Sequence, residues 1–159
     1  MNFPVLLGAA LIPTIVGFIW YNPKVFGNAW MKAADMTEEK MKGANMAVIF
    51  GVSIILSIML SIQMNFVSIH QHHVANLFVG SESAETTAYF ENFMALYGEM
   101  HRTWTHGLAH GFAAGLFFAL PVLGTNALFE RKGFKYILVN VGYWTVTLMA
   151  MGAVICQFA

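Results

Sequence analysis

Histidine is the residue type whose spacing in this sequence best suits chemistry, and all six histidines lie between residues 70 and 110. His106 and His110 are four residues apart, the spacing at which two imidazoles on one helix face can hold one metal ion. If that helix continues unbroken toward the N-terminus, Glu99 and Arg102 share its histidine side, because the four positions fall within about 80° of arc. The pattern predicts a transition-metal site, zinc being one example, with His106, His110 and Glu99 as first ligands.

Three more histidines occur in the run His70-Gln71-His72-His73, just after an apolar segment. We expect His70, His72 and His73 to emerge close enough to His106 and His110 to supply further ligands. Two other interpretations of the pair formed by His106 and His110 stay open. The imidazoles can be neutral and donate N–H groups to helix carbonyls or hydroxyls, which makes them packing contacts, or they can carry protons.

Four long segments without Lys, Arg, Asp or Glu must position these histidines, at about residues 3–21, 44–66, 103–123 and 136–158. Each supplies the ~20 apolar residues with which a helix crosses ~30 Å of hydrocarbon. Continuous apolarity without alternation argues against a barrel, and a soluble bundle would need polar helix faces. With 58% hydrophobic residues, the sequence predicts an all-α membrane protein, one four-helix bundle formed by the single domain 1–159.

The distribution of positive charge predicts the orientation in the membrane. Seven of the eight Lys and Arg residues lie in the gaps after the first and third segments, and Arg102 alone lies in the middle gap. Because cytoplasmic loops carry the excess of Lys and Arg, the Lys-rich loops are expected in the cytoplasm and both termini outside. The expected location is the inner (cytoplasmic) membrane of a bacterium, and the uncharged N-terminal end disfavours a cleaved signal peptide.

The two long connections are predicted to contain helices of their own. The first, residues 22–43, has a helix start at Asp35-Met36-Thr37-Glu38 and is expected to form a short cytoplasmic interfacial helix. The outer segment, 68–102, passes a turn at Gly80-Ser81-Glu82-Ser83 and becomes amphipathic from Ala84 onward. We expect an outer helix that lies on the membrane face or extends the third spanning helix.

Small residues recur every four positions in two of the spanning segments. Gly107, Gly111 and Gly115 form a stripe that permits close contact between helices, and we expect it to support a homo-oligomer. Ala9, Pro13 and Gly17 form a second stripe, and Pro13 predicts a kink in the first helix.

Several classes of function and partner receive no support from the sequence. The formal net charge is zero, so no basic surface is available to bind nucleic acid, and membrane lipid is the expected partner. The single cysteine, Cys156, lies in the last apolar segment, which excludes an intrachain disulfide and indicates a small core residue. We recognise no nucleophile with an adjacent base and no phosphate-binding glycine loop, so catalysis has little support.

Three parts of the sequence resemble the uncharacterised bacterial membrane-protein family called domain of unknown function 1761. They are the stretch Trp20-Tyr21-Asn22-Pro23-Lys24-Val25-Phe26-Gly27-Asn28-Ala29-Trp30-Met31, the stretch His106-Gly107-Leu108-Ala109-His110-Gly111, and Thr125-Asn126-Ala127-Leu128-Phe129-Glu130-Arg131-Lys132 with the following Asn140-Val141-Gly142-Tyr143. The resemblance spans nearly the whole chain. It implies a small four-helix membrane protein and implies no activity.

Several functions remain compatible with these observations. The first is a non-enzymatic bundle with an outward-facing metal or ligand site. The alternatives are an oligomeric transporter or channel subunit, a membrane enzyme with a lipid or quinone bound beside the histidines, and a purely structural accessory protein.

Overall fold

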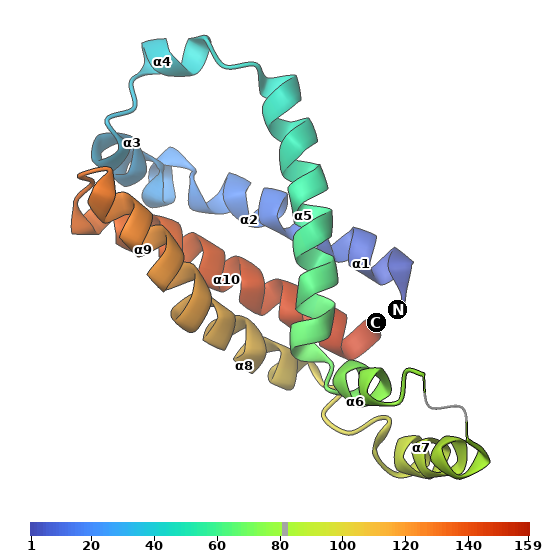
Figure 1. The fold of residues 1–159 in the computed structure, drawn as a ribbon. Coiled ribbons are helices and arrows are strands. Elements are labelled where there is room, and N and C mark those ends of the chain that lie inside the picture. Colours follow the sequence, from blue (N-terminus) through green and yellow to red (C-terminus); the bar gives the residue numbers. More distant parts are fainter. Residues whose placement is uncertain (81–82) are drawn as a thin grey trace.

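The computed structural model describes residues 1–80 and 83–159, and every regular element in this part of the chain is a helix (Figure 1). Within these residues, four helical segments are long and apolar enough to cross a membrane. They are Phe3–Trp20, Met46–Ser68, Trp104–Phe129 and Phe134–Phe158. The segments pack together, which confirms the predicted all-α architecture with four membrane-spanning helices.

The first spanning segment is kinked, as Pro13 predicts. It consists of α1 (Phe3–Ala9) and α2 (Ile12–Trp20), with a turn between them. Pro13 has no N–H to donate to the carbonyl of Ala9, so the regular bonding pattern is interrupted at this point. The small-residue stripe serves packing: Ala9 and Pro13 are buried, and Gly17 lies against the ring of Tyr143.

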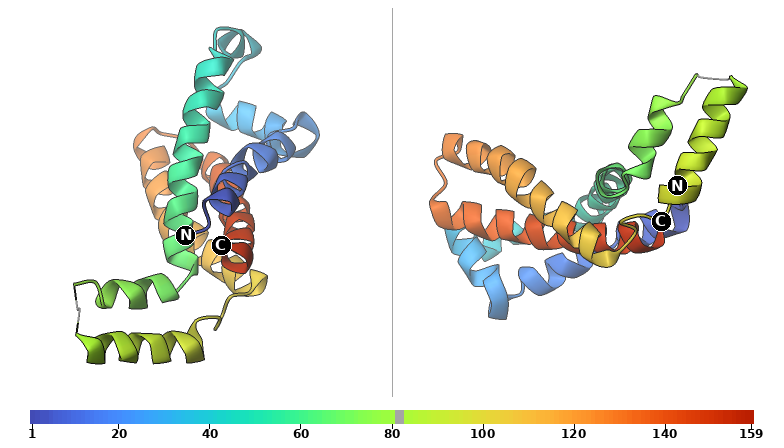
Figure 2. Two further views of the ribbon diagram at one scale, coloured as in Figure 1. Left: turned by 90° about the vertical axis from the view of Figure 1, so that its right-hand side faces the viewer. Right: turned by 90° about the horizontal axis from the view of Figure 1, so that it is seen from below.

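The core of the bundle lies near one end, where the two termini meet. The second spanning helix, α5 (Met46–Ser68), buries residues only in its C-terminal half, whereas its N-terminal half is exposed. There it packs with α1 and with α10 (Phe134–Phe158), around Leu6, Met64 and Met151. The termini lie side by side in both views of Figure 2, and the Asn2 side-chain amide donates a hydrogen bond of 3.2 Å to the Phe158 carbonyl.

The glycine stripe of the third spanning segment packs against α10 of the same chain. This segment comprises α8 (Trp104–Ala114), a π-helical turn, η2 (Gly115–Ala119), and α9 (Leu120–Phe129). A Cβ at Gly107 would collide with the Gly152 carbonyl, and one at Gly111 would collide with the Leu148 carbonyl. In this structure the predicted backbone-to-backbone packing is therefore made within the chain, between α8 and α10.

The third segment is longer than predicted because a wider turn accommodates its proline. The sequence analysis ends this helix near residue 123, whereas α9 continues to Phe129. Pro121 cannot donate a backbone bond, and just before it the Leu120 N–H donates to the Gly115 carbonyl, five residues back. Such a π-helical turn takes up the missing bond without ending the helix.

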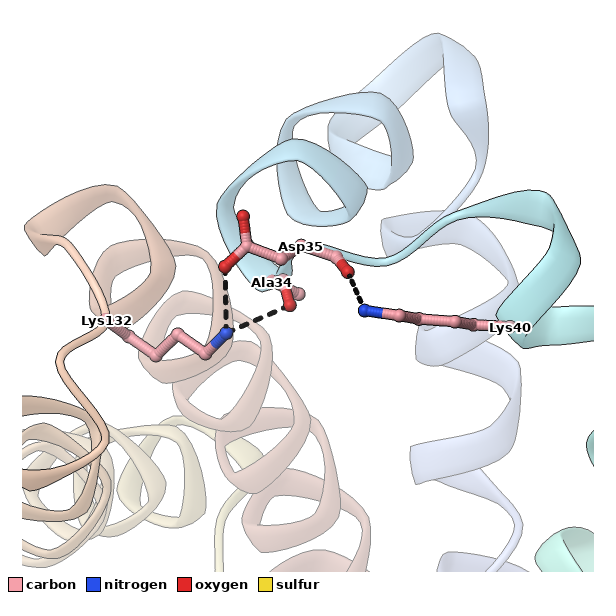
Figure 3. A network of polar contacts seen from close by, with 4 residues as sticks. All are labelled: Ala34, Asp35, Lys40 and Lys132. Carbon is pink, nitrogen blue, oxygen red and sulfur yellow. Dashed lines mark hydrogen bonds and ion pairs between the residues drawn. The ribbon is translucent and has the colours of Figure 1, made fainter.

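The two Lys-rich connections meet at the end of the bundle opposite the termini. The first contains η1 (Pro23–Gly27), α3 (Asn28–Ala34) and the predicted short helix, α4 (Glu38–Lys42), which is capped by Thr37. Lys132 forms an ion pair of 3.1 Å with the Asp35 carboxylate and donates to the Ala34 carbonyl, and Lys40 donates to the Asp35 carbonyl (Figure 3). Seven of the eight cationic side chains therefore belong to this end.

The predicted outer segment forms two helices, α6 (Gln71–Leu77) and α7 (Ala84–Tyr97), which project away from the other end of the bundle (Figures 1 and 2). The amphipathic helix begins at Ala84 as predicted, with Ser83 as its cap, while Ser81 and Glu82 of the predicted turn lie outside the described residues. Of the two arrangements expected for this helix, an unbroken extension into residues 106–110 is not found, because α7 ends at Tyr97 and α8 begins at Trp104. His101 has a left-handed backbone with φ 62°, which separates α7 from α8.

Candidate metal centre

Two histidines of the candidate centre lie in the first turns of α8. Thr103 caps this helix by accepting a hydrogen bond from the His106 N–H at 3.3 Å, so His106 and His110 follow on successive turns. Each immediately precedes a glycine that packs on α10. Because one residue turns the helix by about 100°, the two imidazoles leave α8 beside the α10 contact, on the side where α5 ends.

The third histidine comes from the end of α5. Ser68 and Ile69 are buried where α5 terminates, and His70 follows as the first residue of the turn into α6. Cys156 holds this region in place from α10, because its thiol lies 3.4 Å from the Ser68 carbonyl and 3.3 Å from the His101 carbonyl. The buried thiol is free, in agreement with its predicted role as a small core residue.

Three ring nitrogens converge at this junction. The Nε2 atom of His106 lies 3.0 Å from the Nε2 atom of His70 and 3.0 Å from that of His110. One ligand atom from each of these three residues falls within 4.8 Å of the others. His70 is exposed, whereas His106 and His110 are half-buried, so the group is accessible from the protein surface. We refer to His70, His106 and His110 as the three-histidine group.

Hydrogen bonding alone does not satisfy this arrangement well. A neutral imidazole nitrogen offers either one N–H or one lone pair in the ring plane. The Nε2 atom of His106 has two close nitrogen neighbours, so it can at most share one hydrogen between them. A packing role for the histidines would require hydrogen bonds from the rings to carbonyls or hydroxyls. Among the described residues, these three rings make no such bond.

The spacing of the nitrogens is close to that of metal ligands. Metal–nitrogen bonds of about 2.0–2.1 Å in tetrahedral geometry place two ligand nitrogens about 3.3 Å apart. The two short Nε2 separations, 3.0 Å each, need to widen by only a few tenths of an ångström. The donor set of three imidazoles with one side open is suited to a transition-metal ion with an additional exchangeable ligand.

The other predicted ligands lie outside this group. The Nε2 atom of His72 lies 2.8 Å from the side-chain amide nitrogen of Asn65. Because an amide nitrogen can only donate, the lone pair of the His72 Nε2 atom accepts this hydrogen bond and is not free for a metal ion. Burial lowers the pKa of His72, and the positive N-terminus and Arg102 act in the same direction, which keeps this ring neutral. His73 is exposed, and Glu99 lines a different cavity together with His72 and Arg102. The left-handed turn at His101 removes Glu99 from the α8 face.

A fourth histidine was missed by the sequence analysis. The His101 ring is stacked on the His106 ring, with centroids 4.9 Å apart and planes 20° apart, and its centroid lies 6.3 Å from that of His70. Helical spacing could not identify it, since it lies five residues before His106 and outside α8. Its position depends on the left-handed turn, for which histidine in the sequence is only a weak signal.

With the fold and this group described, comparison with known protein families becomes informative. The model of the family described as "Protein of unknown function (DUF1761)" matches residues 4–156. The chain belongs to the DUF1761 family. The match confirms the resemblance seen in the sequence, and in this DUF1761 protein it includes the three-histidine group and nearly all of the four spanning segments. No curated protein and no solved structure matches the chain.

Proposed function

We propose that this DUF1761 protein binds a transition-metal ion through His70, His106 and His110 and acts by binding rather than by catalysis. The observation that carries the proposal is that the His106 Nε2 atom lies 3.0 Å from the Nε2 atom of His70 and 3.0 Å from that of His110. Three ring nitrogens that face one another cannot all be satisfied by hydrogen bonds among themselves, because each neutral nitrogen offers only one N–H or one lone pair. A metal ion satisfies all three at once.

The expected sidedness places this site on the outside of a bacterial cytoplasmic membrane. The Lys-rich connections lie at the end of the bundle that carries Lys132 and Asp35, and the three-histidine group lies at the other end with Arg102. The positive-inside tendency therefore favours an outward-facing group with both termini on the same side. Reporter fusions after Lys40 and after Ala159 test this orientation; a cytoplasmic signal after Ala159 would contradict it.

Metal analysis of the full-length protein purified in detergent tests the binding itself. We expect about one transition-metal ion per chain after loading and removal of excess metal. The double variant His106→Ala/His110→Ala should lose this metal, whereas His73→Ala, a change at an exposed histidine outside the group, should keep it. The proposal fails if the wild-type protein holds no stoichiometric metal, or if the double variant holds the same amount and remains folded by circular dichroism.

A further inference from the structure

The charges around the three-histidine group limit which ion it can hold. All three donors are uncharged imidazole nitrogens, and within residues 1–80 and 83–159 no histidine nitrogen lies within 4.0 Å of a carboxylate; the ion pair formed there is Lys132–Asp35, at the opposite end. Arg102 donates from Nε to the Cys156 carbonyl at 3.1 Å, and it shares with Glu99 a cavity that the three histidines do not line. A bound ion would therefore keep its full positive charge.

The position of the group makes that charge costly. His110 lies in the second turn of a spanning segment, and its side chain is half-buried. The cost of transferring an ion from water to a less polar environment rises with the square of its charge, so a monovalent ion incurs only about a quarter of the penalty of a divalent one. Zinc sites commonly reduce this cost with carboxylates among or behind the histidine ligands. No such compensation is seen among the described residues here.

A soft donor lies next to the group. A cavity of about 190 Å³ is lined by His70 of the group together with His101 and Met100. Thioether sulfur favours Cu(I) over divalent ions of the first transition series, while imidazole binds both kinds. The low charge of Cu(I) and its preference for soft donors therefore both favour it at this site.

We infer that the three-histidine group takes copper in the +1 state, bound by His70, His106 and His110, with Met100 as the soft donor through which the ion enters. This inference rests on the proposed metal-binding function and names its ion. It involves no change in the oxidation state of the copper.

Parallel titrations of the full-length protein in detergent test the choice of ion. Cu(I), kept reduced under anaerobic conditions, is supplied in competition with a colorimetric Cu(I) chelator, and Zn(II) in competition with a zinc chelator. We expect one Cu(I) per chain, bound at least an order of magnitude more tightly than Zn(II). Zn(II) binding that is equal or tighter overturns the inference and leaves the metal-binding proposal intact. If neither ion nor any other transition metal binds, the proposed function itself fails.

A methionine variant separates the soft donor from the histidines. Met100→Leu keeps the size of the side chain and removes the sulfur, so Cu(I) affinity should fall about 10- to 100-fold while Zn(II) affinity stays the same. Met41→Leu, at an exposed methionine in α4 at the opposite end, is the matched control and should change neither. Unchanged Cu(I) affinity in a folded Met100→Leu protein overturns the role assigned to the sulfur.

Discussion

Replacing Gly111 by alanine should destabilise the bundle and weaken the metal site together. A methyl group at this position meets the Leu148 carbonyl and the Met149 backbone, not the flexible end of a side chain. The α8 and α10 helices must therefore separate by on the order of 1 Å before the new contacts reach ordinary van der Waals distance. Overpacking of this kind typically costs about 1–3 kcal/mol, and we expect the upper part of that range because backbone has to move.

The same displacement reaches the three-histidine group. His110 directly precedes Gly111, and its Nε2 atom lies 3.0 Å from that of His106, whose own contact with His70 spans two helices. A shift of α8 by on the order of 1 Å relative to the end of α5 exceeds the tolerance of metal-ligand geometry, about 0.2 Å. Gly111→Ala should therefore lower metal affinity even in detergent conditions where the protein stays folded.

Gly51→Ala is the matched control for this experiment. Gly51 lies within α5, and a Cβ there would meet no atom within 4 Å. The assays are thermal unfolding in detergent followed by circular dichroism, and metal content after loading. Gly51→Ala should behave like the wild-type protein in both. A Gly111→Ala protein with the same midpoint and the same metal content would refute the intrachain packing of the glycine stripe.

Three further predictions concern the ion pair, the buried thiol and the effect of pH. Lys132→Met should change the free energy of unfolding by less than about 1 kcal/mol, because the Asp35 partner is 80% exposed; a larger loss in a denaturant titration would contradict this. Cys156→Ala should cost about 1–2 kcal/mol, since it removes a buried thiol and its contacts with two carbonyls, whereas Cys156→Ser should retain part of this stability. Metal affinity, measured by chelator competition, should fall as the solution is acidified, because protonated imidazole cannot bind a metal ion.

Features that depend only on residues close together in the sequence could be predicted from the sequence. Lipid demands about 20 apolar residues per helix, so the four spanning segments are visible in composition alone. The kink at Pro13 is equally local, because it rests on the chemistry of one side chain and the few backbone groups beside it. The i, i+4 pair His106 and His110 belongs to the same class.

Other features were decided only when the helices packed. His70 and His106 are 36 residues apart, and only the junction of α5, α8 and α10 brings their rings to 3.0 Å. A left-handed turn at His101 stacked that ring on His106 and excluded Glu99, although helical spacing had favoured the carboxylate. The glycines of α8 could equally have met a second copy of the chain, since a small-residue stripe specifies close contact without specifying its partner. Local sequence determined that helices form and where they begin, whereas the distances between residues far apart in the chain were set by the packing of those helices.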